Sequence, residues 1–289
     1  MNHIPVLVRE VLEFLAIKPE GIYIDATLGS GGHTEHILRK LGQKGRVIGF
    51  DRDEEAIKRT VKRLRDKRLI ALHASFSEMK EHLQRAGFRE VDGIMMDLGV
   101  SMEQLKDPER GFSFQSEGRL DMRMDRSQSL TAEEIVNTWG FQRLERIIRE
   151  YGEERFARPI ARAIINERRK GPIYSCKQLA EIVKRVKHKR ERIHPATKTF
   201  QALRIAVNNE LEELQEGLNQ SVGLLKRGGR LVVLSYHSLE DRIVKRFFVK
   251  AEREGLMRRL NKKPVVPSEE EIRLNPSARS AKLRGGEKL

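Results

Sequence analysis

The chain has 289 residues, and its 57 lysines and arginines against 42 aspartates and glutamates give a formal net charge of +15. This length is enough for an α/β domain and a smaller second domain. The single cysteine excludes an internal disulfide, and no apolar run approaches the roughly 20 residues that a membrane-spanning helix needs. We therefore expect a cytoplasmic protein, without a membrane partner, whose basic surface binds a polyanion such as RNA.

A glycine-rich turn follows the first predicted strand. The apolar run that begins at Ile22 ends in Asp25, and Gly29, Gly31 and Gly32 precede a segment with helical spacing. Glycine allows a positive φ and the close approach of a ligand, so this order predicts a strand, a ligand-binding loop and a helix. The same glycines would also fit an ordinary tight turn.

Acidic residues end later predicted strands as well. The segments 46–50 and 91–97 are predicted strands that lead to Asp51 and Asp97, and a further strand precedes Phe76. The carboxyl ends of strands face the ligand crevice of an open α/β sheet, and an acid after the second strand binds ribose hydroxyls. Each acid could instead cap the following segment. The ring of Phe76 could stack on adenine or belong to the core.

The loop pattern helps to choose between ligands. Its G-x-G-G-H sequence differs from the G-x-G-x-x-G pattern that binds the pyrophosphate of a dinucleotide. The acids on either side of it add negative charge, which suits a sulfonium cation and a ribose better than two phosphates. We therefore expect S-adenosylmethionine as the cofactor, and a nicotinamide-dependent oxidoreductase is the weaker alternative.

The alternation of strands and helices stops after the fourth strand. Helical patterns without intervening strands predict an inserted all-helical domain at 109–206, which we expect to recognise RNA. The flanking segments 1–108 and 207–289 then form one α/β domain. One long helix is expected at 198–218.

The last quarter of the chain returns to the α/β pattern and then loses it. A short helix is expected to end at Gly228 and Gly229, followed by a fifth strand, 230–236. From Gly255 onward the sequence is polar, basic and interrupted by prolines, so irregular or edge structure, partly mobile, is expected there.

Two basic segments are candidate contacts for RNA phosphates. One is the run from Lys184 to Arg192, which could also be a solvated helix face, and the other is the basic tail. The candidate RNA-binding residues are Lys184, Arg185, Lys187, Lys189, Arg190, Arg279, Lys282 and Arg284.

Several longer motifs resemble the MraW/RsmH family of ribosomal small-subunit RNA (cytosine-N4)-methyltransferases across nearly the whole chain. The matching stretches are HIPVL at 3–7, DATLG at 25–29, DLGVS at 97–101, RGFSF at 110–114, LDMRMD at 120–125, IHPATKTFQALR at 193–204, HSLEDR at 237–242 and NPSARSAKLR at 275–284. One departure is Tyr236, where phenylalanine is expected.

The resemblance implies a class I, Rossmann-like methyltransferase sheet with a helical insertion. It also implies S-adenosylmethionine-dependent methylation of N4 of a cytidine in small-subunit ribosomal RNA, at the decoding centre. The implied cofactor contacts are Gly31, Gly32, His33, Asp51, Phe76, Asp97 and Gln104. A non-catalytic RNA-binding factor of ribosome assembly is the alternative, and the oligomeric state stays open.

The cytosine amine is a poor nucleophile, so the site should offer acceptors for its hydrogens. We expect Asp97 or Ser101, together with the strand end Ser235, Tyr236 and His237, to supply these acceptors and a stacking surface. The transfer requires no metal, and the histidines show no spacing typical of metal ligands.

Overall fold

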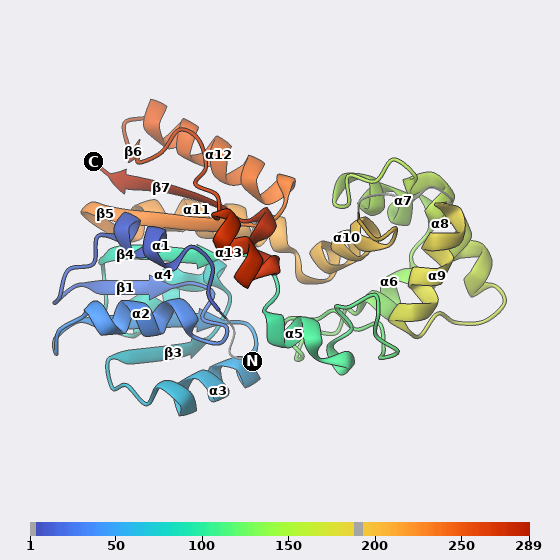
Figure 1. Cartoon of the computed structure of the whole chain (residues 1–289), viewed down its shortest axis with the longest axis horizontal. Coiled ribbons are helices and arrows are strands. Elements are labelled where there is room, and N and C mark those ends of the chain that lie inside the picture. Colours follow the sequence, from blue (N-terminus) through green and yellow to red (C-terminus); the bar gives the residue numbers. More distant parts are fainter. Residues whose placement is uncertain (1–3, 188–192) are drawn as a thin grey trace. The chain divides into compact units, whose positions relative to one another are not determined.

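The computed structural model describes residues 4–187 and 193–289. The chain divides into two compact units, which Figure 1 shows by the colours of the sequence. We call residues 1–99 with 211–289 the sheet unit, and residues 100–210 the helical unit. None of the described helices is long and apolar enough to cross a membrane.

The sheet unit is built on a seven-stranded sheet in the order β3-β2-β1-β4-β5-β7-β6. Strands β1 to β5 are parallel, and β7 runs antiparallel to both of its neighbours. The chain moves outward from β1 through β2 to β3 and then returns to β4, so β1 and β4 flank the point where the strand order reverses. The strands are β1 (Ile22–Asp25), β2 (Arg46–Asp51), β3 (Leu69–His73), β4 (Val91–Asp97), β5 (Leu225–Ser235), β6 (Met257–Arg259) and β7 (Lys282–Lys288).

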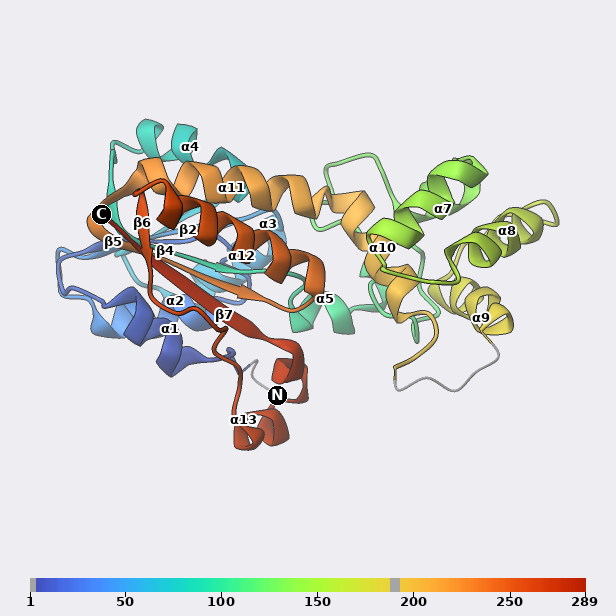
Figure 2. The same ribbon diagram turned by 90° about the horizontal axis from the view of Figure 1, so that it is seen from above.

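Alternating side chains along the strands form a core on each face of the sheet. Ile24, Ile94 and Val233 lie in one core, while Tyr23 and Met95 lie in the other. Figure 2 shows the helices in two layers with the sheet between them. One layer contains α1 (Val8–Leu15) and α2 (Gly32–Lys40), and the other contains α4 (Met79–Arg85), α11 (Glu210–Leu224) and α12 (Ser238–Arg253). The remaining α-helices of this unit are α3 (Glu54–Leu64) and α13 (Glu269–Leu274).

The helical unit has a hydrophobic core of its own. Buried residues of this core come from each of the helices α6 to α10, and include Ile135, Leu144, Ile160, Leu179 and Leu203. The helices are α5 (Met102–Lys106), α6 (Ala132–Thr138), α7 (Phe141–Glu150), α8 (Ala157–Arg168), α9 (Cys176–Val186) and α10 (Thr197–Asn208). The unit extends a few residues beyond the predicted limits of the insertion on both sides.

The structure corrects the expectation of one long helix at 198–218. Helix α10 ends at Asn208, Asn209 has a left-handed φ of 53°, and α11 begins at Glu210. Asparagine tolerates this conformation better than most residues, which is why it commonly ends helices. Strand β5 begins at Leu225, directly after α11, so the expected short helix before Gly229 is also wrong.

The expectation of irregular or edge structure in the tail holds for β6, which is at the edge of the sheet, but not for β7. Strand β7 pairs with β5 from Lys282 to Glu287 and lies inside the sheet. Gly285 and Gly286 hide this strand in the sequence, because glycine weakens a strand pattern. The aromatic packing requires them: a Cβ atom at Gly285 would lie 2.6 Å from Cδ1 of Phe14.

Candidate functional site

The glycine-rich loop joins β1 to α2 in a conformation that needs glycine. Gly29 and Gly31 have φ values of 48° and 74°, in the left-handed region. A Cβ atom at Gly31 would lie 2.5 Å from Cγ2 of Thr60 in α3. The backbone of the loop is therefore packed closely against its neighbours.

The three strand-end acids all contact this loop or its flanks. Asp25 accepts a hydrogen bond from the hydroxyl of Thr34 at 2.6 Å, and Asp51 accepts one from the amide of Gly29 at 2.6 Å. The amide of Asp97 donates to the hydroxyl of Thr27 at 2.6 Å. The parallel register of β2, β1 and β4 brings these residues to the same edge of the sheet. The acids and the loop thus form one connected polar network.

Burial dominates the charge state of two of these acids. It raises the pKa of Asp51 to about 6, against the opposing effect of the amides of Asp53 and Gly29. Burial also raises the pKa of Asp25, which the hydroxyl of Thr34 and the imidazole of His33 partly offset. A cationic or hydroxyl-rich ligand at this edge would relieve that desolvation cost.

Asp97 is held from the side of β5. The hydroxyl of Tyr236 donates to its Oδ1 at 2.7 Å, while Nε2 of His33 lies 3.5 Å from its Oδ2. Burial, followed by the charge of Asp97, raises the pKa of Tyr236 well above its usual value, so the phenol stays a donor. Nε2 of His33 is buried and has no hydrogen-bond partner among the described residues. An unpaired buried nitrogen at this point fits a missing ligand.

The rest of the predicted β5 strand end serves local structure. Ser235 is buried, with Oγ 3.5 Å from the carbonyl oxygen of Lys282. His237 caps α12: its Nδ1 accepts the amide of Glu240 at 3.4 Å, and the Glu240 carboxylate accepts the amides of Tyr236 and His237. Nε2 of His237 is buried and lies 3.1 Å from Oε1 of Glu240. The role of Ser235 and His237 as acceptors for a substrate amine stays a prediction.

Phe76 begins the short helix η1 (Phe76–Glu78) after β3, and its ring is half-buried. One side of the ring packs on α11, since a Cβ atom at Gly217 would lie 2.6 Å from Cδ2 of Phe76. The hydroxyl of the preceding residue, Ser75, donates to the carboxylate of Glu213, which also lies in α11. These contacts fix the ring while leaving part of it accessible.

Ser101 and Gln104 belong to the helical unit, where they form a capping box at the start of α5. The amide of Gln104 donates to Oγ of Ser101, and the amide of Ser101 donates to Oε1 of Gln104, both at 3.1 Å. The S-x-x-Q spacing that signals this motif is visible in the sequence. The sequence prediction missed Thr27 and Thr34, whose hydroxyls bind Asp97 and Asp25, although both threonines lie in or beside the glycine loop.

The structure separates the predicted RNA-binding residues into paired, buried and exposed groups. Lys187 is wrong as a surface contact, because it forms a buried ion pair with Glu154 at 2.8 Å, with side chains only 2% and 3% exposed. The side chain of Arg284 is also buried and bonded to Asp241, at 2.7 Å. Burial of these ion pairs removes both cations from solvent.

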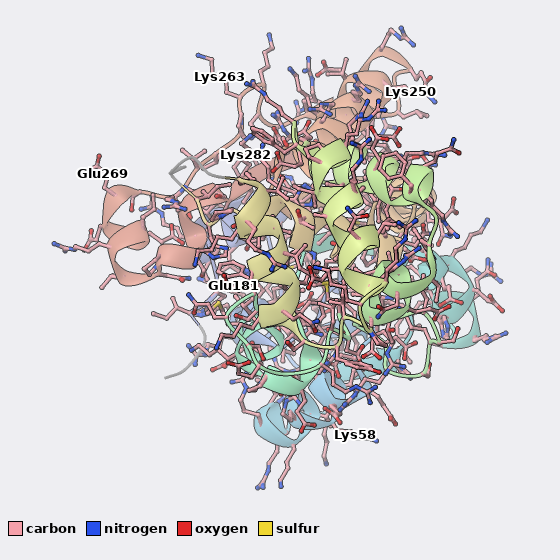
Figure 3. The ribbon with its side chains drawn as sticks, turned by 90° about the vertical axis from the view of Figure 1, so that its right-hand side faces the viewer. Lys58, Glu181, Lys250, Lys263, Glu269 and Lys282 are labelled. Atoms are coloured by element: carbon pink, nitrogen blue, oxygen red, sulfur yellow. The ribbon has the colours of Figure 1, made fainter. Side chains whose placement is uncertain are left out.

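The other candidates lie nearer the solvent. Lys184 and Arg185 are exposed and pair with Glu181 and Glu167. Lys282 donates to Asp241 at 3.1 Å, and its side chain is 39% exposed. Figure 3 labels Lys282 and, separately, Glu181. The last three candidates are Arg279, which is exposed, and Lys189 and Arg190, which lie outside the described residues.

Comparisons with known proteins agree along the full length of the chain. The sequence model of the MraW methylase family matches residues 1–289. A protein of Carboxydothermus hydrogenoformans named "Ribosomal RNA small subunit methyltransferase H" is 47% identical over 308 aligned residues, which cover 100% of this chain and 98% of that protein. A protein of the same name from Caldicellulosiruptor bescii is 47% identical, with coverage of 100% and 99%. A solved structure, a putative rRNA-methylase from Clostridium thermocellum, covers 100% of both chains with 15% identity and a TM-score of 0.50, which shows likeness of fold.

Proposed function

The chain belongs to the MraW methylase family, and from that premise we propose that it methylates N4 of a cytidine in small-subunit ribosomal RNA, at the decoding centre. S-adenosylmethionine is the cofactor. The full-length relatives named as small-subunit ribosomal RNA methyltransferases support this substrate class. The observation that carries the proposal is the network of strand-end acids around the glycine loop, with one oxygen of Asp97 held by Tyr236.

The residues of this edge fit the parts of the cofactor. When bound, S-adenosylmethionine supplies an electrophilic methyl group on a positively charged sulfur. The carboxylate of Asp51 keeps lone pairs beyond its two amide contacts, and we assign them to ribose hydroxyls. The accessible part of the Phe76 ring would stack on adenine. The loop glycines Gly31 and Gly32 allow the close approach, and Nε2 of His33 is free to make a hydrogen bond.

The attacking amine needs help because its lone pair is delocalised into the cytosine ring. Oδ1 of Asp97 accepts the Tyr236 hydroxyl, and we assign Oδ2, which lies 3.5 Å from Nε2 of His33, to an amine hydrogen. We assign Asp97 as the acceptor that favours a tetrahedral nitrogen and takes its proton after transfer. Tyr236 is then a positioning residue for this carboxylate. Ser101 is a weaker candidate, since its hydroxyl oxygen already accepts the Gln104 amide.

The target base must also be out of its stack, which favours a single-stranded or partly assembled RNA. Lys184, Arg185, Arg279 and Lys282 remain proposed contacts to its backbone, because their side chains are not buried. Lys189 and Arg190 remain predictions from the sequence.

The deciding experiment measures methyl transfer from labelled S-adenosylmethionine to small ribosomal subunits and to bare RNA, both lacking the modification. Nucleoside analysis should find the label in N4-methylcytidine. Label in another nucleoside would contradict the assigned atom. Cofactor binding without any incorporation would favour the RNA-binding assembly factor.

A further inference from the structure

Helix α8 presents an exposed row of arginines together with an aromatic ring. Arg158 and Arg162 are four residues apart within α8, so they lie on one face, and Arg155 lies in the turn directly before the helix; all three are exposed. Phe156, at the N-terminal end of the helix, is 42% exposed. We call these four residues the α8 arginine face. It lies outside both basic segments that the sequence singled out.

The arginines of this face lack the acidic partners that two arginines have on the neighbouring helix α7. In the neighbouring α7, Arg146 pairs with Glu150, and Arg149 pairs with Glu145 four residues away. On α8, by contrast, Arg158 and Arg162 are themselves four residues apart, a spacing at which like charges repel. No carboxylate of the described residues pairs with either guanidinium.

The one acid at the right spacing is already engaged. Glu154 stands four residues before Arg158, but it is buried against Lys187 at 2.8 Å. The fold thus keeps an unneutralised positive row on this helix. An external anion would satisfy its charge.

The chemistry of the face matches nucleic acid. A guanidinium group binds phosphate through two parallel hydrogen bonds, and the exposed ring at the N-terminal end of the same helix offers a stacking platform for an unpaired base. We propose that the α8 arginine face binds the phosphate backbone of a single-stranded segment of the ribosomal RNA substrate, with Phe156 stacked on one of its bases. The inference rests on the proposed function for its RNA.

Two charge-matched double variants test the phosphate contacts. R158Q/R162Q removes the unpaired arginines, and R146Q/R149Q removes two exposed arginines that pair with acids on the neighbouring α7. The affinity for bare small-subunit RNA is measured over a range of salt concentrations. The slope of log K against log salt should fall by about 1.4 in R158Q/R162Q, from roughly 0.7 for each single-strand phosphate contact. The slope should stay near the wild-type value in R146Q/R149Q, and cofactor affinity should be unchanged in both.

The stacking contact has its own pair of variants. F156L keeps an apolar side chain and should lower the RNA affinity about tenfold without changing the salt slope. F156Y keeps the ring and should bind like the wild type. Equal losses in both variants would overturn the stacking role.

The outcomes separate this inference from the proposed function. A wild-type salt slope in R158Q/R162Q, or an equal loss in R146Q/R149Q, overturns the phosphate assignment even if the wild type methylates RNA normally. Normal binding of bare RNA with reduced methylation of assembled subunits also overturns it, in favour of a contact with protein. Absence of methyl transfer by the wild type contradicts the proposed function instead.

Discussion

The glycine-loop region of the sheet unit and the core of the helical unit bury carboxylates in different ways. In the sheet unit, Asp25 and Asp51 accept hydrogen bonds from neutral groups, the hydroxyl of Thr34 and the amide of Gly29. In the helical unit, Glu154 is neutralised by Lys187 inside the protein. A buried carboxylate that no lysine or arginine neutralises keeps its charge available for a ligand, whereas a buried ion pair only holds elements together. This contrast separates residues of the site from residues of the scaffold.

The largest effect should come from breaking the buried ion pair. Lys187→Met leaves Glu154 charged and unpaired in the interior, which should lower the free energy of unfolding of the helical unit by about 3–5 kcal/mol. Urea denaturation followed by tryptophan fluorescence measures this, because Trp139 lies in that unit. The double variant K187M/E154L should recover most of the loss. Cofactor affinity should stay at the wild-type level, and a parallel loss would contradict the separation of roles.

Asp97→Asn tests the acceptor in the sheet unit. Loss of the carboxylate should lower methyl transfer about 100- to 1,000-fold at saturating cofactor, since the developing charge on the amine loses its partner. Single-turnover assays with labelled cofactor measure the rate, and thermal unfolding checks that the fold is intact. Asp66→Asn, which removes an acid paired with Arg68 at the surface, is the control and should keep full activity.

The pH dependence of cofactor binding should report Asp51. Its pKa of about 6 means that the carboxylate, the form that accepts ribose hydroxyls, is lost as the pH falls through 6. Affinity for S-adenosylmethionine should therefore fall about tenfold between pH 7 and pH 5. Calorimetric titration at each pH measures this. A flat profile would remove Asp51 from the ribose contact.

The smallest effect is expected from Tyr236→Phe, which deletes the hydroxyl bonded to Asp97. The resemblance expects phenylalanine here, so the hydroxyl should adjust the carboxylate rather than create the activity. The rate should fall about fivefold, as for loss of one hydrogen bond. The loss should appear in the single-turnover rate at saturating cofactor, with cofactor affinity unchanged. A parallel loss of cofactor affinity would contradict the positioning role.

The sequence was informative where structure is local. Apolar runs that end in acids identified β1, β2 and β4, and the class I fold that the resemblance implied is confirmed. The contacts of the helical unit join distant segments, which no local pattern reveals. Lys187 and its partner Glu154 are 33 residues apart in the sequence, so no local pattern revealed the pair. Lys187 stands in a basic run and was therefore predicted to be a surface residue. The ring of Phe248 packs against Gly286, so this position requires glycine. Because glycine weakens a strand pattern, the sequence of β7 predicted irregular or edge structure.

The discontinuous sheet unit has a consequence for biosynthesis. The glycine loop is synthesised before most of the chain. Asp97, at the end of β4, pairs with Leu234 of β5, which is synthesised much later. The helical unit, a continuous segment of mostly helical contacts, can fold while the ribosome is still adding β5. The sheet is complete only when β7 has inserted between β5 and β6. We therefore expect the newly made enzyme to gain its cofactor site only after β7 has been synthesised, when the helical unit has already formed.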